Sequence, residues 1–190
     1  MPTFDLRGIT VAKYNNTDGT ISYATPMSVG DAMSCNLELR FAEGRLYAEG
    51  SLAEYLKIAV GGTISIGVKY IKTPAQILMY GAKAKTRTIN EKQIISTKTS
   101  GLDVPNYVGT AFYAPDLIDS VPKYTCAFVY KTLFGPPGLT FQTKGDSLAF
   151  QTPTTTGEFL VTDTDEQDLM EVAVCDTIED AKAWIKAVLA

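Results

Sequence analysis

The stretch at residues 123–134, KYTCAFVYKTLF, shows the pattern that dominates this chain of 190 residues. Alternate residues of a β-strand point to opposite faces of its sheet. One face here carries Tyr124, Cys126, Phe128 and Tyr130, and the other carries Thr125, Ala127 and Val129. Neither face is strongly polar, so the stretch predicts a strand that is covered on both sides.

The same alternation recurs along the whole chain. We expect strands at residues 6–14, 20–29, 33–41, 44–49, 63–71, 92–98, 106–114, 123–134, 139–152, 155–162 and 169–175. Many short strands separated by turn residues are typical of a β-sandwich or a barrel. The length suits one domain. The sequence therefore predicts a single, mainly β domain over residues 1–190, built as a β-sandwich or partial barrel.

Two helices are expected beside the sheet. Thr73-Pro-Ala-Gln76 reads as a capping box with proline at the first helical position, and Gly81 is a natural helix end. A second helix is expected from Asp176 to the C-terminus, with Asp176 and Glu179 as its capping box. Its apolar stripe consists of Ile178, Ala181, Ile185 and Val188, with Trp184 beside it. Such a terminal helix normally docks on a sheet or on a neighbouring molecule.

Charge is unevenly distributed although the net charge is only −4. Residues 69–98 carry seven bases and one acid, whereas residues 163–180 carry eight acids and no base. These regions are either two solvated faces of one domain or opposite patches that meet, within a subunit or between copies. The bases considered for contacts between subunits are Lys83, Lys85, Arg87, Lys92 and Lys98, and the acids are Asp163, Asp165, Glu166 and Asp168.

The residue types leave little room for catalysis. The chain contains no histidine, which removes the Ser-His and Cys-His pairs and the commonest metal ligand, although carboxylate or lysine chemistry stays open. The segment at 61–67, GGTISIG, lacks the lysine of a phosphate-binding loop and reads as a strand. The acids at 163–168 do not match the register of a calcium-binding EF-hand, which favours an acidic surface turn. We expect a protein that is not an enzyme, with no metal and no cofactor.

Other segments narrow the range of partners. The three cysteines are far apart and are expected as buried free thiols. The N-terminus has no apolar signal region, and no apolar run has the length of a membrane span, so we expect no membrane contact. Specific nucleic-acid binding by the basic region is disfavoured because few aromatic residues accompany the bases and the chain as a whole is acidic.

The segment at 140–151, TFQTKGDSLAFQ, repeats Phe-Gln-Thr on both sides of a two-residue hairpin signal, Gly145-Asp146. Closing a hairpin there directs Phe141 and Phe150 to the core. The opposite face then carries neutral polar side chains, among them Thr140, Gln142 and Gln151.

Several stretches together resemble the major tail proteins of phages with long, non-contractile tails, which are the subunits of the tail tube. The strongest likeness is at residues 107–159, YVGTAFYAPDLIDSVPKYTCAFVYKTLFGPPGLTFQTKGDSLAFQTPTTTGEF. Residues 44–68, TPAQILMYG at 73–81 and EDAKAWIKAV at 179–188 resemble an earlier strand pair, a short helix and a closing helix of that family. The basic stretch at 83–100 resembles the family least.

The resemblance implies a β-sandwich of the tail-tube type with a flanking helix and no catalytic residues. Copies would form six-membered rings whose sheets join into a barrel around a lumen. Stacked rings would form a tube in the virion, assembled in the host cytoplasm, through which the genome passes without tight binding. The implied partners are further copies of the chain, the tape-measure protein, a tail terminator and proteins of the baseplate or tip.

Within this picture, the basic segment at 82–104 is expected to be a long arm or loop that reaches the acidic region of another subunit. Thr140, Gln142 and Gln151 are expected to line the channel or to lie in a subunit contact. Two alternatives stay open. The chain could be the tube subunit of a contractile tail or a tail-like bacteriocin, or a β-sandwich binding module of a virion or cell surface.

Overall fold

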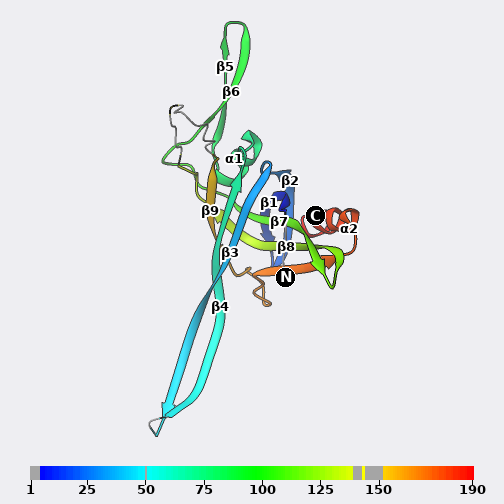
Figure 1. The fold of residues 1–190 in the computed structure, drawn as a ribbon. Coiled ribbons are helices and arrows are strands. Elements are labelled where there is room, and N and C mark those ends of the chain that lie inside the picture. Colours follow the sequence, from blue (N-terminus) through cyan, green and yellow to red (C-terminus); the bar gives the residue numbers. More distant parts are fainter. Residues whose placement is uncertain (1–4, 50, 139–142, 144–151) are drawn as a thin grey trace.

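The computed structural model describes residues 5–49, 51–138, 143 and 152–190 (Figure 1). Its strands are β1 (Arg7–Thr17), β2 (Thr20–Ser28), β3 (Ala32–Ala48), β4 (Ser51–Val68), β5 (Lys83–Ile89), β6 (Lys92–Lys98), β7 (Tyr107–Ile118), β8 (Val121–Phe134), β9 (Thr154–Leu160) and β10 (Met170–Cys175). The helices are α1 (Thr73–Tyr80) and α2 (Ile178–Val188). The prediction of a mainly β fold with a short flanking helix and a C-terminal helix is confirmed.

One antiparallel sheet forms the body, in the order β2-β1-β7-β8-β9-β4-β3. Strand β8 is central, because it pairs with β7 along one edge and with both β10 and β9 along the other. Strands β5 and β6 form a separate two-stranded hairpin. The strand expected at 139–152 lies almost entirely outside the described residues.

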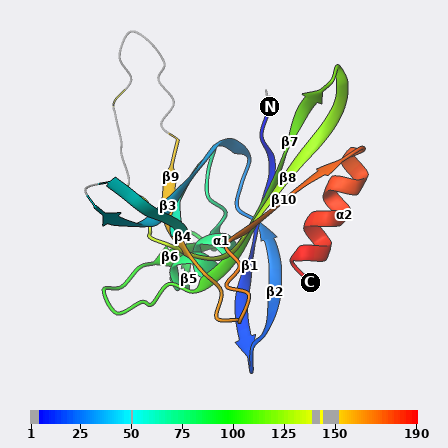
Figure 2. The same ribbon diagram turned by 90° about the horizontal axis from the view of Figure 1, so that it is seen from below.

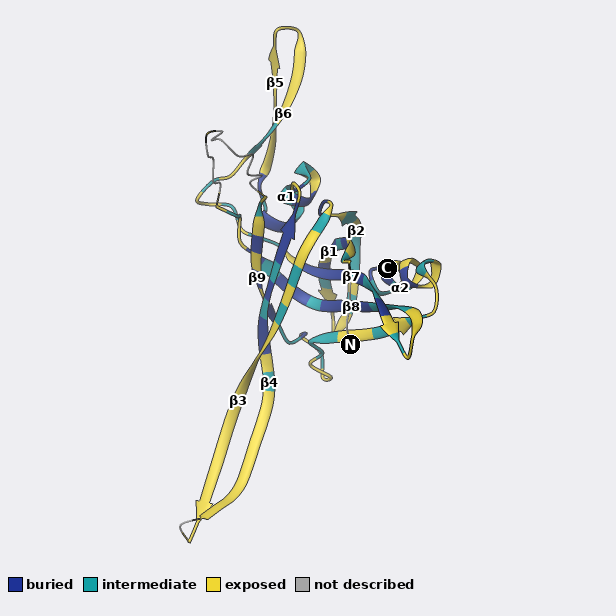
Figure 3. Cartoon of the chain, in the orientation of Figure 1, coloured by how far each residue is buried: buried dark blue, intermediate teal, exposed yellow. Residues whose placement is uncertain are grey.

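The sheet is covered on both faces. On one face, the sheet curls so that Ile9 of β1, Ile64 of β4 and Phe159 of β9 enter the same core, together with Met79 of α1. On the other face, α2 covers Cys126 and Phe128 of β8 and neighbouring residues of β1 and β7. Figure 3 shows the buried residues concentrated in this body. The predicted two-sided burial of residues 123–134 is confirmed, and the curled sheet is consistent with the sandwich or partial-barrel class.

Helix α1 spans the expected residues but starts differently. Thr73 is already helical and Lys72 occupies the N-cap without a side-chain hydrogen bond, so the predicted capping box is wrong. Gln76 instead donates a hydrogen bond to the carbonyl of Ile71, at 2.9 Å. The helix ends as predicted at Gly81, whose φ of 66° is left-handed; a Cβ there would lie 2.2 Å from a backbone carbonyl oxygen.

Helix α2 also begins one residue later than expected. Thr177, not Asp176, is the N-cap, and its hydroxyl oxygen accepts a hydrogen bond from the Asp180 amide at 3.1 Å. The same hydroxyl donates to the Asp180 carboxylate at 2.7 Å. Asp176 instead forms an ion pair with Lys123. The predicted apolar stripe is confirmed, since Ala181 and Ile185 are buried against β8.

The largest departure from the predicted strands is in β3 and β4. The sequence predicted two short strands at 33–41 and 44–49 and none at 51–62, but β3 and β4 are continuous and pair from Ala32 and Val68 to Ala48 and Ser51. Register shifts interrupt the pairing at three places along β3. The alternation was hard to read here because the outer half of this pair carries apolar residues that do not enter the core.

Candidate interaction surfaces

The outer half of the β3–β4 pair, residues 41–48 and 51–60, extends away from the body and is called here the β3–β4 arm (Figures 1 and 3). All of its described residues are exposed except Ala59, which is half-buried. A two-stranded hairpin with no further packing is at best marginally stable in water. The arm therefore gains little from the body and has the properties of a segment that packs against another molecule.

On one face of the arm, charged and aromatic side chains of the two strands pair with one another. The Glu43 carboxylate lies 3.2 Å from Lys57 Nζ and 3.7 Å from the Arg45 guanidinium. The same guanidinium lies over the Tyr55 ring, 5.4 Å from its centre, and Lys57 lies over Phe41 at 4.5 Å. Hydrogen bonding to Lys57 and Tyr55 lowers the pKa of Glu43. These cross-strand pairs hold the two strands of the arm in register.

The opposite face of the arm is apolar. Leu46 on β3 and Leu56 and Ile58 on β4 are 57%, 60% and 52% exposed, although all three are large aliphatic residues. Ile58 pairs with Ala42 and Leu56 pairs with Gly44, so small residues lie beside the large aliphatic side chains on this face. We call this surface the apolar arm face. The only charged side chain on it is that of Glu54, opposite Leu46.

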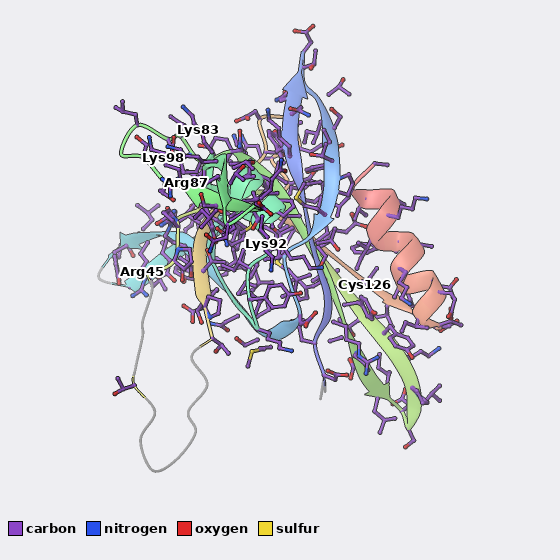
Figure 4. The ribbon with its side chains drawn as sticks, turned by 90° about the horizontal axis from the view of Figure 1, so that it is seen from above. Arg45, Lys83, Arg87, Lys92, Lys98 and Cys126 are labelled. Carbon is purple, nitrogen blue, oxygen red and sulfur yellow. The ribbon has the colours of Figure 1, made fainter. Side chains whose placement is uncertain are left out.

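The basic segment at 82–104 contains the β5–β6 hairpin, which projects from the opposite end of the body (Figure 1). Opposed residues of an antiparallel pair share a face. The pairs Lys83↔Lys98, Lys85↔Ser96, Arg87↔Ile94 and Ile89↔Lys92 therefore place all five candidate bases on one side of the hairpin. Figure 4 looks down on it, with Lys83, Arg87, Lys92 and Lys98 labelled. None of the five forms an ion pair with a described residue.

The acidic region is divided by the fold. Asp163, Asp165, Glu166 and Asp168 lie in the connection between β9 and β10, residues 161–169, which we call the acidic loop. Strand β10 separates this loop from the acids at the start of α2. Within one molecule, the structure therefore does not bring the candidate bases and acids together: among the described residues, the only ion pair of a candidate acid is the one between Asp163 and Lys131.

A polar surface that the sequence analysis did not identify lies on the outer face of β3, β4 and β9. Its rows follow from the strand register: Ser34, Gly67 and Thr154; Asn36, Ser65 and Thr156; and Glu38, Thr63 and Glu158. The opposite faces of these strands carry the core residues Ile64, Ile66 and Phe159. We call the nine-residue surface the polar sheet face. The Ser and Thr residues at alternate positions are visible in the sequence, but the sequence does not show which strands pair to bring them onto one surface.

The predicted polar hairpin surface cannot be placed. Thr140, Gln142 and Gln151 all lie outside the described residues, so the structure assigns them neither to a channel nor to a contact.

The thiols lie in the body of the protein and none forms a disulfide. Cys126 is buried and Cys175 half-buried beneath α2, with their Sγ atoms 3.8 Å apart on neighbouring strands. Burial and the neighbouring Cys175 thiol raise the pKa of Cys126 to about 12, and burial raises the pKa of Cys35 to about 12. Such thiols are weak nucleophiles at neutral pH because the thiolate is scarce.

Small-molecule chemistry finds little support in the described residues. A groove of about 400 Å³ between the start of β3 and the β7–β8 sheet is lined mostly by apolar side chains, with Asp5 as its one charged group. A ligand site normally adds several convergent polar groups to such a lining. In the described ranges, no three Cys, Asp or Glu side chains are arranged to hold a metal ion. Neither described helix has the length and apolarity needed to cross a membrane.

Comparison with known proteins adds no identification. No protein-family model matches this chain, and no curated protein matches its sequence.

Proposed function

We propose that this chain is a tail-tube subunit of a phage or prophage. Copies polymerise into stacked six-membered rings, and the resulting tube is the virion conduit through which the genome is ejected. The observation that carries the proposal is the apolar arm face. Burying an aliphatic side chain is worth about 1.5–3 kcal/mol, so Leu46, Leu56 and Ile58 favour association over solvent exposure.

The shape of the molecule supports association with copies of itself. The β3–β4 arm extends from one end of the body (Figure 1). An arm that packs on a different surface of its neighbour makes a heterologous contact, and contacts of this kind generate closed rings or open-ended stacks. Among the described residues, β2 and β3 at the two ends of the main sheet have no further strand beside them, and closure into a ring would cover edges of this kind.

The polar sheet face suits the wall of a DNA channel. DNA-binding surfaces derive most of their affinity from bases that neutralise phosphates. The polar sheet face carries two carboxylates, Glu38 and Glu158, and no base, and Asn36 donates a hydrogen bond to Glu38 at 2.9 Å. Such a wall would let DNA pass without holding it. Arg40 continues the same alternation one row further toward the arm, so a single base borders the polar sheet face at that end.

This role requires no catalytic group and no cofactor. The proposed partners are other copies of the chain, the tape-measure protein inside the growing tube, a terminator at one end and a baseplate or tip protein at the other. A contractile particle would use a tube subunit of the same design, and its additional sheath would be a separate protein.

Electron microscopy of the purified full-length protein in negative stain, over a series of concentrations, tests the proposal. We expect rings with a central hole at low concentration and tubes at high concentration, accompanied by a rise in sedimentation coefficient. Monomers at every concentration, with an unchanged sedimentation coefficient, would contradict the proposal and favour a monomeric binding module.

A further inference from the structure

The cationic face of the β5–β6 hairpin is unfavourable in an isolated molecule. Lys83 and Lys98 are directly opposed, and like charges at opposed positions destabilise an antiparallel pair. Lys85, Arg87 and Lys92 extend the same charge along the face, and the described residues offer it no anionic partner. An anionic surface of another molecule would convert this repulsion into attraction.

The acidic loop is an anionic surface held in a fixed shape. The Lys131 ammonium binds the Asp163 carboxylate, and the Asn16 amide donates to the Asp163 carbonyl at 3.1 Å. A backbone hydrogen bond from Thr162 to Asp168, 3.0 Å long, closes the base of the loop. Asp165 and Glu166, at the tip of the loop, are exposed and form no ion pair with a described residue.

The two charged surfaces lie at opposite sides of the molecule. In Figure 1 the β5–β6 hairpin is at the top, and the acidic loop hangs below β8 and β10, on the side of the β3–β4 arm. Figure 2, which looks along that long direction, shows the loop and the hairpin close together in projection. A second copy displaced along this direction would therefore bring its acidic loop toward the hairpin of the first.

We propose that the basic face of the β5–β6 hairpin binds the acidic loop of a second copy, head to tail along the long direction of the molecule. The inference rests on the proposed function and specifies the contact between successive rings. Lys83, Lys85 and Arg87 meet Asp165 and Glu166 in this contact. Since these side chains are exposed, the contact weakens as salt screens the charges.

Two charge-reversal variants and their mixture test the contact. The hairpin variant carries Lys85→Glu and Arg87→Glu, and the loop variant carries Asp165→Lys and Glu166→Lys. In each variant, the reversed side chains face charges of the same sign on the unchanged surface of the next copy, so we expect the mean tube length to fall at least about tenfold. An equimolar mixture restores opposite charges at every contact between alternating copies, and we expect its tube length to return to within about twofold of wild type.

A control variant, Lys13→Glu with Lys182→Glu, makes the same change in net charge as the hairpin variant, at other exposed positions. It should form tubes of wild-type length, and all variants should keep the unfolding midpoint of the wild type. Wild-type tube lengths in both charge-reversal variants, or no recovery in the mixture, would overturn the contact and leave the tube subunit intact. If the wild type forms no rings or tubes at all, the proposed function itself fails.

A gel-shift assay with duplex DNA, on the same proteins, tests whether the basic face binds DNA phosphates rather than the acidic loop of a second copy. Loss of DNA binding in the hairpin variant, with tube length unchanged, would show that the basic face binds phosphates and would overturn the contact between copies.

Discussion

Lys131 donates to both carboxylate oxygens of Asp163, with Nζ lying 2.7 Å from Oδ1 and 2.6 Å from Oδ2. The Lys131 side chain is only 10% exposed, and its ammonium also lies over the rings of Tyr14 and Tyr107. Asp163→Asn leaves this nearly buried cation without its anion. We expect a loss of about 1–3 kcal/mol in unfolding free energy, below the value for a fully buried pair because Asp163 is partly solvated. Urea denaturation measures it.

Asp165→Asn is the matched control for that substitution. It removes the same charge from the same loop, but Asp165 contacts no base among the described residues. Its unfolding free energy should stay within about 0.5 kcal/mol of wild type. Equal losses in the two variants would show that the Lys131–Asp163 pair contributes nothing specific.

Gly62 lies where two strands and an aromatic ring meet. A Cβ at this position would lie 2.1 Å from the carbonyl oxygen of Glu38 and 2.4 Å from Cζ of Phe159. Gly62→Ala should therefore displace buried Phe159 or the β3 backbone, and we expect it to lower the unfolding free energy by about 1–3 kcal/mol. At Gly101 a Cβ would meet nothing within 4 Å, so Gly101→Ala should leave urea denaturation unchanged. A stable Gly62→Ala protein would contradict this packing.

Polar substitutions on the apolar arm face should separate assembly from folding. Leu56→Asn with Ile58→Asn removes aliphatic surface that is already exposed in the single molecule. We expect the unfolding free energy to change by less than about 0.5 kcal/mol and the concentration needed for ring formation to rise at least about tenfold. Analytical ultracentrifugation reports the assembly. Val172→Asn with Val174→Asn, exposed positions on β10, is the control, and similar losses from both double variants would argue against a specific role of the arm.

Alkaline pH should lower the unfolding free energy of the protein. Burial and the Cys175 neighbour raise the pKa of Cys126 to about 12; burial and Glu171 raise the pKa of Tyr130 to about 12. The unfolded chain therefore releases these protons at lower pH than the folded protein. The stabilising contribution is complete below the ordinary thiol pKa of about 8.5 and is lost as pH rises toward about 12.

Urea denaturation at about pH 7 and about pH 10 measures this loss, and Cys126→Ala should reduce the difference between the two values. An unfolding free energy that does not fall between these pH values would show that the two groups ionise equally easily in the folded and unfolded states.

The body of the fold was predictable because its residues obey simple rules. The strand at 123–134 alternates fully, and both of its faces are buried as expected. Gly81 ends α1 because the chain there needs a left-handed residue. The cap of α2 was misplaced by one residue because Asp176 and Thr177 are both good N-caps, and the sequence does not show that Asp176 pairs with the distant Lys123.

The candidate surfaces were less predictable because they depend on strand register. The five bases of the β5–β6 hairpin are visible in the sequence, but strand β5 was missed, and with it the fact that all five share a face. Residues 44–49 of the arm were predicted as a strand and residues 51–60 were not, and the apolar arm face was missed because alternation does not reveal whether a face meets its own chain or another one. The rows of the polar sheet face join residues more than a hundred positions apart.

Among the described residues, strand β3 is an edge strand of 17 residues, and its pairing with β4 is interrupted at Ala32/Ser34, at Arg40/Phe41 and at Leu46/Tyr47. The first interruption adds Met33 to β3, whereas the other two add Val60 and Ala53 to β4. Each bulge bends and twists the strand pair where it occurs, so the free edge of β3 is not one straight template for a further strand. An edge that twists in this way is a poorer partner for a stray extended chain, which counters edge-to-edge aggregation of the single molecule.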